Sequence, residues 1–99
     1  MEFLKEYDIT ENQIQKIKDR YNTKIVDFIE ENSEFIEEKL DYLQKEKFVL
    51  LYEVIYNNIK IFLEEISELK RKIEIMKQQN FSIKAMNMVL IEEDLYDMI

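Results

Sequence analysis

The chain has 99 residues, with 22 acidic and 14 basic side chains and a formal net charge of −8, and it contains no cysteine, histidine, glycine or proline. Without cysteine and histidine it lacks disulfides, thiolate nucleophiles and the commonest general base and metal ligand, so we expect no enzyme, no metal site and no cofactor. Without glycine it lacks the residue that tight hairpins and phosphate-binding loops favour, which favours helices over sheets.

Length and charge set further expectations. We expect one domain over residues 1–99, with an all-α fold that is either a compact helical bundle or a helical-repeat array of three to six antiparallel helices. The start of the chain, MEFLKEYD, has acidic residues where a signal peptide needs positive charge, and the longest apolar run, residues 48–52, is too short to cross a membrane. We therefore expect a cytoplasmic protein with no membrane association and, given its charge, a partner with a basic surface.

The first predicted helix begins after an apolar segment, residues 1–9. Thr10 and Gln13 have the spacing of a capping box, in which each side chain bonds to the backbone of the other residue. Apolar residues then follow at helical intervals of three and four: Ile14, Ile17, Tyr21, Ile25 and Phe28. Two interpretations remain open over residues 10–45: one long helix, or shorter helices that break near Asn22 and at Ser33, with Ser33 as an N-cap.

The second half of the chain has a more regular apolar pattern. Its apolar residues alternate at intervals of four and three: Phe48, Tyr52, Ile55, Ile59, Phe62, Ile66, Leu69, Ile73 and Met76. This heptad spacing predicts one helix that buries the stripe from Ile59 to Met76 against another helix of the same chain, and a coiled-coil homodimer is the alternative. A restart at Ser67, like that at Ser33, is also open.

Residues 78–82 form the clearest break in the chain. Asn80 tolerates the left-handed conformation that ends a helix, and Ser82 can cap the helix that follows. A final helix is predicted from Ile83, with four apolar residues facing inward: Met86, Val89, Leu90 and Leu95.

Residues 28–48 and 62–81 form an internal repeat once Phe35 is left unpaired. The alignment pairs Lys39 with Lys72 and Phe48 with Phe81, among other matches. A period of about 33 to 34 residues in helical sequence is typical of helical repeats, in which each unit packs against its neighbour.

The repeated layout of helices and turns resembles the helical repeats of the mitochondrial transcription termination factor (mTERF) family. The residues that carry the resemblance are Leu40, Leu43 and Phe48, then Ile73, Met76, Asn80, Phe81 and Ser82, with Asp8, Ile9 and Thr10 as an earlier turn. It covers about two and a half units, and it departs from the family at the turn glycine, replaced by Lys47 or Asn80, and at the missing proline. The resemblance implies a repeat module that binds nucleic acid through basic surfaces, which contrasts with the acidic charge of this chain.

An acidic stripe is the candidate site. Glu30, Glu34, Glu37, Glu38 and Asp41 would lie on one face of a continuous helix, flanked by Glu31, whereas the second copy has Lys70 and Arg71 at the positions of Glu37 and Glu38. Such charge runs are commonly solvated surfaces. The functional interpretation is that these six residues bind a partner, because their carboxylates can occupy a basic groove that otherwise holds phosphates.

These observations lead to one principal hypothesis and one alternative. Lysine outnumbers arginine by twelve to two, and the frequent residues have codons rich in A and T, as in low-GC genomes, phages and mobile elements. We expect a small non-catalytic protein that binds and regulates a partner protein, such as a phage or mobile-element inhibitor of a nucleic-acid-binding enzyme. The alternative is a nucleic-acid-binding repeat module of the mTERF type.

Overall fold

Helices are the only regular secondary structure in the computed structural model, which describes all residues 1–99. A 3₁₀ helix, η1 (Glu2–Tyr7), precedes eight α-helices: α1 (Glu11–Arg20), α2 (Thr23–Glu31), α3 (Ser33–Lys45), α4 (Leu51–Asn57), α5 (Lys60–Leu63), α6 (Ile66–Gln78), α7 (Ile83–Ile91) and α8 (Glu93–Asp97). The predicted all-α class is confirmed, but nine helices exceed the expected three to six. No helix combines the length and the apolar character that crossing a membrane requires.

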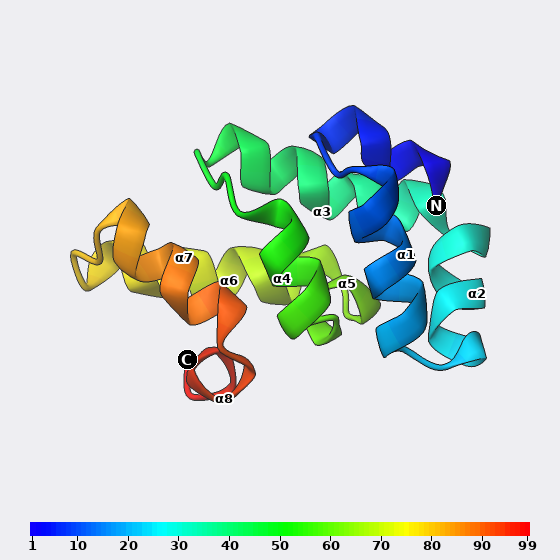
Figure 1. The fold of residues 1–99 in the computed structure, drawn as a ribbon. Coiled ribbons are helices and arrows are strands. Elements are labelled where there is room, and N and C mark those ends of the chain that lie inside the picture. The colour runs from blue at the N-terminus through cyan, green and yellow to red at the C-terminus, as the bar shows by residue number, and fades with distance from the viewer.

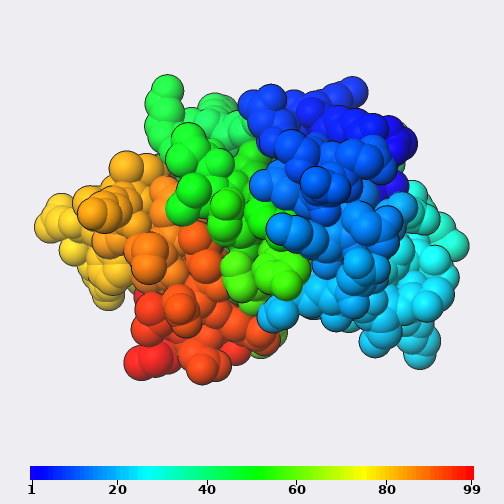
Figure 2. Space-filling model, viewed as in Figure 1, coloured from blue at the N-terminus to red at the C-terminus, as the bar shows by residue number.

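The helices form two rows. In Figure 1, α1, α4 and α7 lie in front and α3 and α6 behind them. Helix α2 joins α1 to α3, α5 joins α4 to α6, and α8 follows α7. Within the front row α4 packs between α1 and α7, and in the rear row α3 packs against α6. The chain therefore runs from one end of the molecule to the other, as the colours of Figure 2 also show.

Three turns of the same geometry precede the front helices α1, α4 and α7. We call each front helix, together with the helices up to the next turn, a unit. Asp8, Lys47 and Asn80 have positive φ angles of 62°, 71° and 63°. At each turn the following residue donates its N–H to the carbonyl five residues back: Ile9 to Leu4, Phe48 to Leu43 and Phe81 to Met76. This is the Schellman arrangement, which satisfies the last carbonyls of a helix. The turns expected at Asp8–Thr10 and Asn80–Ser82 are present.

The aligned lysines of the repeat make matching contacts. Lys39 Nζ donates to the carbonyl of Phe62 at 3.2 Å, and Lys72 Nζ donates to the carbonyl of Tyr96 at 3.0 Å. Phe62 belongs to α5 and Tyr96 to α8, so each lysine joins a rear helix to the short helix that follows the next front helix. Both lysine side chains are buried, which the sequence alone did not indicate.

The capping predictions separate into correct and wrong ones. The Thr10–Gln13 capping box is confirmed, as is the cap at Ser82, whose Oγ accepts from the Ala85 N–H at 3.1 Å. Ser33 is not an N-cap: Asn32 occupies that position, and its side chain donates instead to the carbonyl of Phe28. Ser67 likewise lies inside α6, after its first residue.

Over residues 10–45 the interpretation with several short helices is correct. The chain leaves the helical conformation at Tyr21, and the Asn22 side chain caps α2 by accepting from the Ile25 N–H at 3.0 Å. A second break follows at Asn32. A continuous helix from Thr10 to residue 45 is therefore wrong, since polar side chains satisfy the backbone at each break.

The single heptad helix predicted over residues 48–76 is also wrong. That segment divides into α4, α5 and α6, with the first break at the buried Asn58. The Asn58 side chain donates to the Leu90 carbonyl at 2.9 Å, so a contact with α7 stabilises the break. Phe62, Leu69, Ile73 and Met76 are buried as expected, whereas Ile59 and Ile66 are only half-buried.

One hydrophobic cluster of 22 buried residues runs through the molecule, from Leu4 in η1 to Tyr96 in α8. Met86, Val89 and Leu90 contribute to it as predicted, but Leu95 is 44% exposed and does not face inward. The predicted final helix also ends earlier than expected, at Ile91, so Leu95 belongs to the separate helix α8.

Candidate functional site

The six acidic residues predicted to bind a partner are divided between two helices. The break at Asn32 places Glu30 and Glu31 on α2, and the other four on α3: Glu34, Glu37, Glu38 and Asp41. A single stripe along one continuous helix is therefore not formed. Glu34, Glu38 and Asp41 keep the i, i+4, i+7 spacing within α3, and all three are exposed. We call these three residues the α3 acidic row.

The acidic residues differ in their contacts within the chain. Glu30 lies 3.4 Å from the N-terminal amine and 3.6 Å from Lys18 Nζ, so its charge is partly neutralised. Asp41 accepts a hydrogen bond from Tyr7. Glu34 and Glu38 have no ion pair, and neither has Glu31 or the half-buried Glu37. Their carboxylates are available to a partner.

Tyr7 fixes the position of Asp41. The Tyr7 hydroxyl donates to Asp41 Oδ1 at 2.7 Å, across 34 residues of sequence. Burial raises the pKa of Tyr7 well above its ordinary value, and the hydrogen bond and negative charge of Asp41 raise it further. The phenol therefore remains a hydrogen-bond donor near neutral pH and holds η1 against α3.

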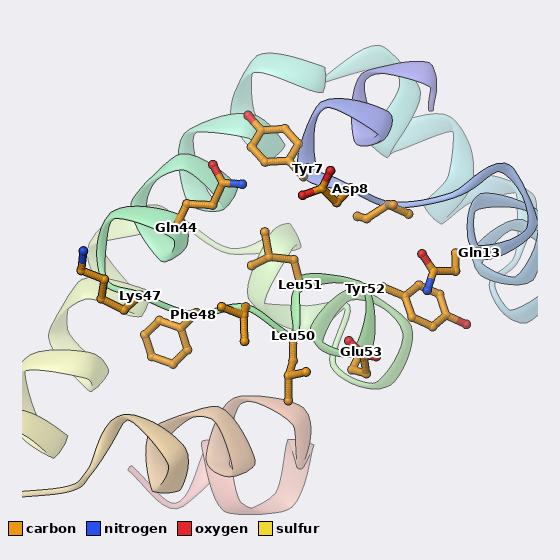
Figure 3. Close-up of a pocket in the computed structure, with 12 residues that line it drawn as sticks. Tyr7, Asp8, Gln13, Gln44, Lys47, Phe48, Leu50, Leu51, Tyr52 and Glu53 are labelled. Atoms are coloured by element: carbon orange, nitrogen blue, oxygen red, sulfur yellow. The ribbon is translucent and has the colours of Figure 1, made fainter.

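A groove that the sequence did not reveal lies between the first and second turns. It has a volume of about 510 Å³ and twelve lining residues: Tyr7, Asp8, Ile9, Gln13, Gln44, Lys47, Phe48, Val49, Leu50, Leu51, Tyr52 and Glu53. Figure 3 shows it between the segment that carries Tyr7 and Asp8 and the segment from Lys47 to Glu53. Ile9, Phe48 and Leu51 are buried beneath it, and its edges are polar. We call this pocket the turn groove.

Val49 accounts for the local structure beside the turn groove. Counted from the positive-φ residue, Val49 stands where the other two turns have the capping residues Thr10 and Ser82. A valine side chain cannot accept a hydrogen bond, and α4 begins only at Leu51 without a side-chain cap. The valine side chain is 79% exposed. An apolar residue at a capping position was the sequence signal that could have indicated this site.

The turn groove and the α3 acidic row are continuous. Tyr7 lines the groove and bonds to Asp41 at the end of the row, and Gln44, one helical turn beyond Asp41, lines the groove as well. Asp8 and Glu53 add carboxylates to the groove, against the single cation Lys47. Apolar lining and negative charge therefore meet on one surface.

Aromatic residues extend this surface along the contact between α1 and α4. The ring of Tyr52, which lines the turn groove, lies 5.5 Å from that of Tyr56, and the Arg20 guanidinium lies 4.6 Å from the centre of the Tyr56 ring. Tyr21 donates its hydroxyl hydrogen to the Tyr56 carbonyl at 2.6 Å, which fixes α1 against α4. Tyrosine and arginine are enriched in protein interfaces.

Lys39 is a buried amine outside this surface. Burial lowers its pKa to about 8, although nearby carboxylates, chiefly Glu65, act in the opposite direction. Its Nζ lies 3.2 Å from the centre of the Phe35 ring and bonds to the Phe62 carbonyl. Lys39 does not line the turn groove, and its contacts join helices within the chain. No group of three or more acidic residues is arranged to hold a metal ion.

The second copy has a different surface from the α3 acidic row. Arg71 bonds to Glu68 one turn away, and the Lys70 amine lies 5.3 Å from the centre of the Tyr42 ring. Lys77 of α6 pairs with Glu46, the residue that follows α3, at 2.7 Å. The basic residues of α6 therefore have contacts within the chain, which the carboxylates of Glu34 and Glu38 lack.

Comparisons with protein-family models, curated proteins and solved structures find no match to this chain.

Proposed function

We propose that the protein is a non-catalytic regulator that binds a partner protein through the turn groove and the α3 acidic row. The partner segment has an apolar side chain that enters the groove and lysine or arginine side chains that meet Glu34, Glu38 and Asp41. The observation that carries this proposal is the Tyr7–Asp41 hydrogen bond, since it joins the groove to the acidic row.

The two parts of the surface make different contributions. Burying one side chain of the size of leucine in the groove contributes about 1.5 to 3 kcal/mol. Each exposed ion pair with the acidic row contributes only about 0 to 1 kcal/mol, but the summed charge accelerates encounter with a basic partner. Affinity thus comes mainly from the groove, and association rate and partner choice come mainly from the row.

The class of partner follows from the charge pattern. Carboxylates spaced along the exposed side of α3 can occupy a basic groove that otherwise holds phosphate groups. A partner with such a groove is a nucleic-acid-binding enzyme, and occupation of the groove would inhibit it. This is the mode of action expected of a small acidic inhibitor from a phage or mobile element.

The test is association with the partner, first identified by crosslinking in the native host and then purified. Surface plasmon resonance compares the parent with the double variant Glu34→Lys, Glu38→Lys at several salt concentrations. The matched control is Asp19→Lys, Glu74→Lys, which changes the net charge equally at exposed sites outside the surface. We expect association about tenfold slower for the row variant and less than about twofold slower for the control. Equal losses, or an affinity independent of salt, contradict the proposal.

A helical-repeat module that binds nucleic acid is the second candidate function. The three matching turns favour it, because they give the chain the repeated layout on which the mTERF resemblance rests. The net charge of −8 opposes it. A salt-dependent mobility shift of labelled DNA or RNA by the purified protein would favour this candidate over the acidic inhibitor.

A further inference from the structure

The turn groove carries its charges at different places along its length. Asp8 and Glu53 are its two carboxylates, and Lys47 is its only cation. None of these three side chains is in an ion pair. Figure 3 shows Lys47 at the opposite end of the groove from Tyr52 and Gln13. The end that Tyr52 lines, which we call the Tyr52 end, therefore has the negative charge of the adjacent Glu53 and no lysine or arginine to balance it.

Glu53 differs in exposure from the carboxylates of the α3 acidic row. Glu53 is half-buried, whereas the three residues of that row are exposed. A partly buried charge interacts more strongly with a bound cation, because water and salt screen it less. Asp8, on the opposite wall of the groove, adds a second negative charge. The Tyr52 end therefore favours a cationic group over a neutral one.

The aromatic rings beside Glu53 already hold one guanidinium group of this chain. Arg20 is in no ion pair, and its guanidinium lies 4.6 Å from the centre of the Tyr56 ring and 5.7 Å from that of the Tyr21 ring. The Tyr52 ring lies 5.5 Å from the Tyr56 ring at an interplanar angle of 30°. This series of aromatic contacts extends from Arg20 to the turn groove, where Tyr52 is a lining residue.

A planar guanidinium fits this combination of groups better than an ammonium group does. It stacks on an aromatic ring and also donates two hydrogen bonds to a carboxylate, whereas a lysine ammonium acts as a point charge. We propose that the Tyr52 end of the turn groove binds an arginine side chain of the partner, stacked on Tyr52 and paired with Glu53. This inference rests on the proposed function, in which the groove takes an apolar side chain of the same partner, and it adds an arginine beside that apolar residue. The groove volume of about 510 Å³ leaves room for both side chains, since pockets of this size enclose drug-sized ligands.

The probe is the blocked dipeptide acetyl-leucyl-arginine amide, titrated into the whole ¹⁵N-labelled chain and followed by the NMR chemical shifts of the backbone N–H groups. Two control dipeptides replace arginine with lysine or with citrulline, which is neutral and has nearly the shape of arginine. We expect the arginine dipeptide to bind about tenfold more tightly than the citrulline dipeptide and also more tightly than the lysine dipeptide, with the shifts concentrated at Asp8, Tyr52 and Glu53.

Each other outcome of this titration is decisive. Equal binding of the arginine and citrulline dipeptides overturns the proposal and leaves the proposed function intact, because the groove then takes only the apolar side chain. Binding of the lysine dipeptide as tight as that of the arginine dipeptide overturns the choice of arginine. Absence of shifts in the groove with all three dipeptides contradicts the proposed function as well.

The substitution Glu53→Gln tests the carboxylate, because it keeps the size of the side chain and removes its charge. We expect the affinity for the arginine dipeptide to fall about tenfold and that for the citrulline dipeptide to change less than about twofold. Glu74→Gln, at an exposed position on α6 outside the groove, is the matched control and should change both affinities less than about twofold. Equal losses for the two dipeptides in Glu53→Gln would show that Glu53 shapes the groove without binding the guanidinium, which overturns the proposal.

The substitution Tyr52→Leu separates stacking from charge. It removes the ring and keeps an apolar side chain in the lining, so the preference for arginine over lysine should disappear while the preference for arginine over citrulline remains. The NMR spectrum of the free variant shows whether it keeps the parent fold, and the Glu53→Gln comparison does not depend on that result. A preference for arginine over lysine that survives in folded Tyr52→Leu overturns the stacking on Tyr52.

Discussion

The two copies of the repeat agree in their interior and differ on their surface. Lys39 and Lys72 are both buried, and each bonds to a carbonyl of the short helix that follows the next front helix. Lys47 and Asn80 adopt the same left-handed turn. On the surface, Glu38 on α3 corresponds to Arg71 on α6. The two copies therefore share the contacts through which their helices pack, whereas their surface charges differ.

The two copies should differ most in the stability that the phenylalanine of each turn contributes. Phe48 is 2% exposed, whereas Phe81 is half-buried. We expect Phe48→Ala to lower the free energy of unfolding by about 3 to 5 kcal/mol, because it removes buried surface and leaves a cavity. Phe81→Ala should lower the free energy of unfolding by clearly less. Urea denaturation followed by circular dichroism measures both, and equal losses would show that the two turns contribute equally to the core.

The lysine of the first copy should make stability depend on pH. In the unfolded chain Lys39 titrates near its ordinary pKa of about 10.4, whereas in the folded protein burial lowers its pKa to about 8. Between these values the unfolded state binds more protons, so stability rises with pH. From pH 7.5 to 9.5 we expect a gain of about 1 to 2 kcal/mol in unfolding free energy, measured by urea denaturation.

Lys39→Met removes the titrating group and should abolish this rise. The same scan on Lys72→Met shows whether the second copy adds to it. If the Lys39→Met variant keeps the full rise of unfolding free energy with pH, other groups cause that rise.

The residues at the capping positions before α7 and α4, Ser82 and Val49, should differ by about 1 kcal/mol in their contribution to the free energy of unfolding. Ser82→Ala removes the side-chain acceptor for the Ala85 N–H, and we expect a loss of about 0.5 to 2 kcal/mol. Val49→Ser supplies a hydroxyl at the corresponding turn and should stabilise the protein by up to about 1 kcal/mol. Thermal unfolding compares the two variants. Destabilisation by Val49→Ser would mean that the segment before α4 cannot adopt a capped geometry.

The smallest effect is expected at the left-handed residues of the two turns. Asparagine tolerates positive φ better than lysine does. Lys47→Gly should therefore raise stability by about 0.5 to 1 kcal/mol, and Asn80→Gly by less, because glycine relieves the strain but also adds freedom to the unfolded chain. The same thermal measurement applies, and a larger gain at Asn80 would contradict the comparison.

Features that depend on hydrogen bonds between residues close together in sequence were predictable from the sequence alone. The absence of glycine and proline and the apolar periodicity indicated helices, and the capping box of Thr10 and Gln13 and the turn at Asn80 with its cap Ser82 are present. Each depends on hydrogen bonds between residues at most five apart. Local backbone chemistry therefore determined the fold class and several helix ends.

Only the tertiary structure decided which periodic segments became separate helices and where the turn groove formed. Asn58 bonds to Leu90 across 32 residues, and Tyr7 bonds to Asp41 across 34. The helical period of the apolar residues indicates which side chains share a helix face. It carries no information about a polar group whose hydrogen-bond partner lies in another unit. For the same reason the sequence predicted one stripe of six acids along a continuous helix, whereas their division between α2 and α3 and the groove beside them depended on how distant segments pack.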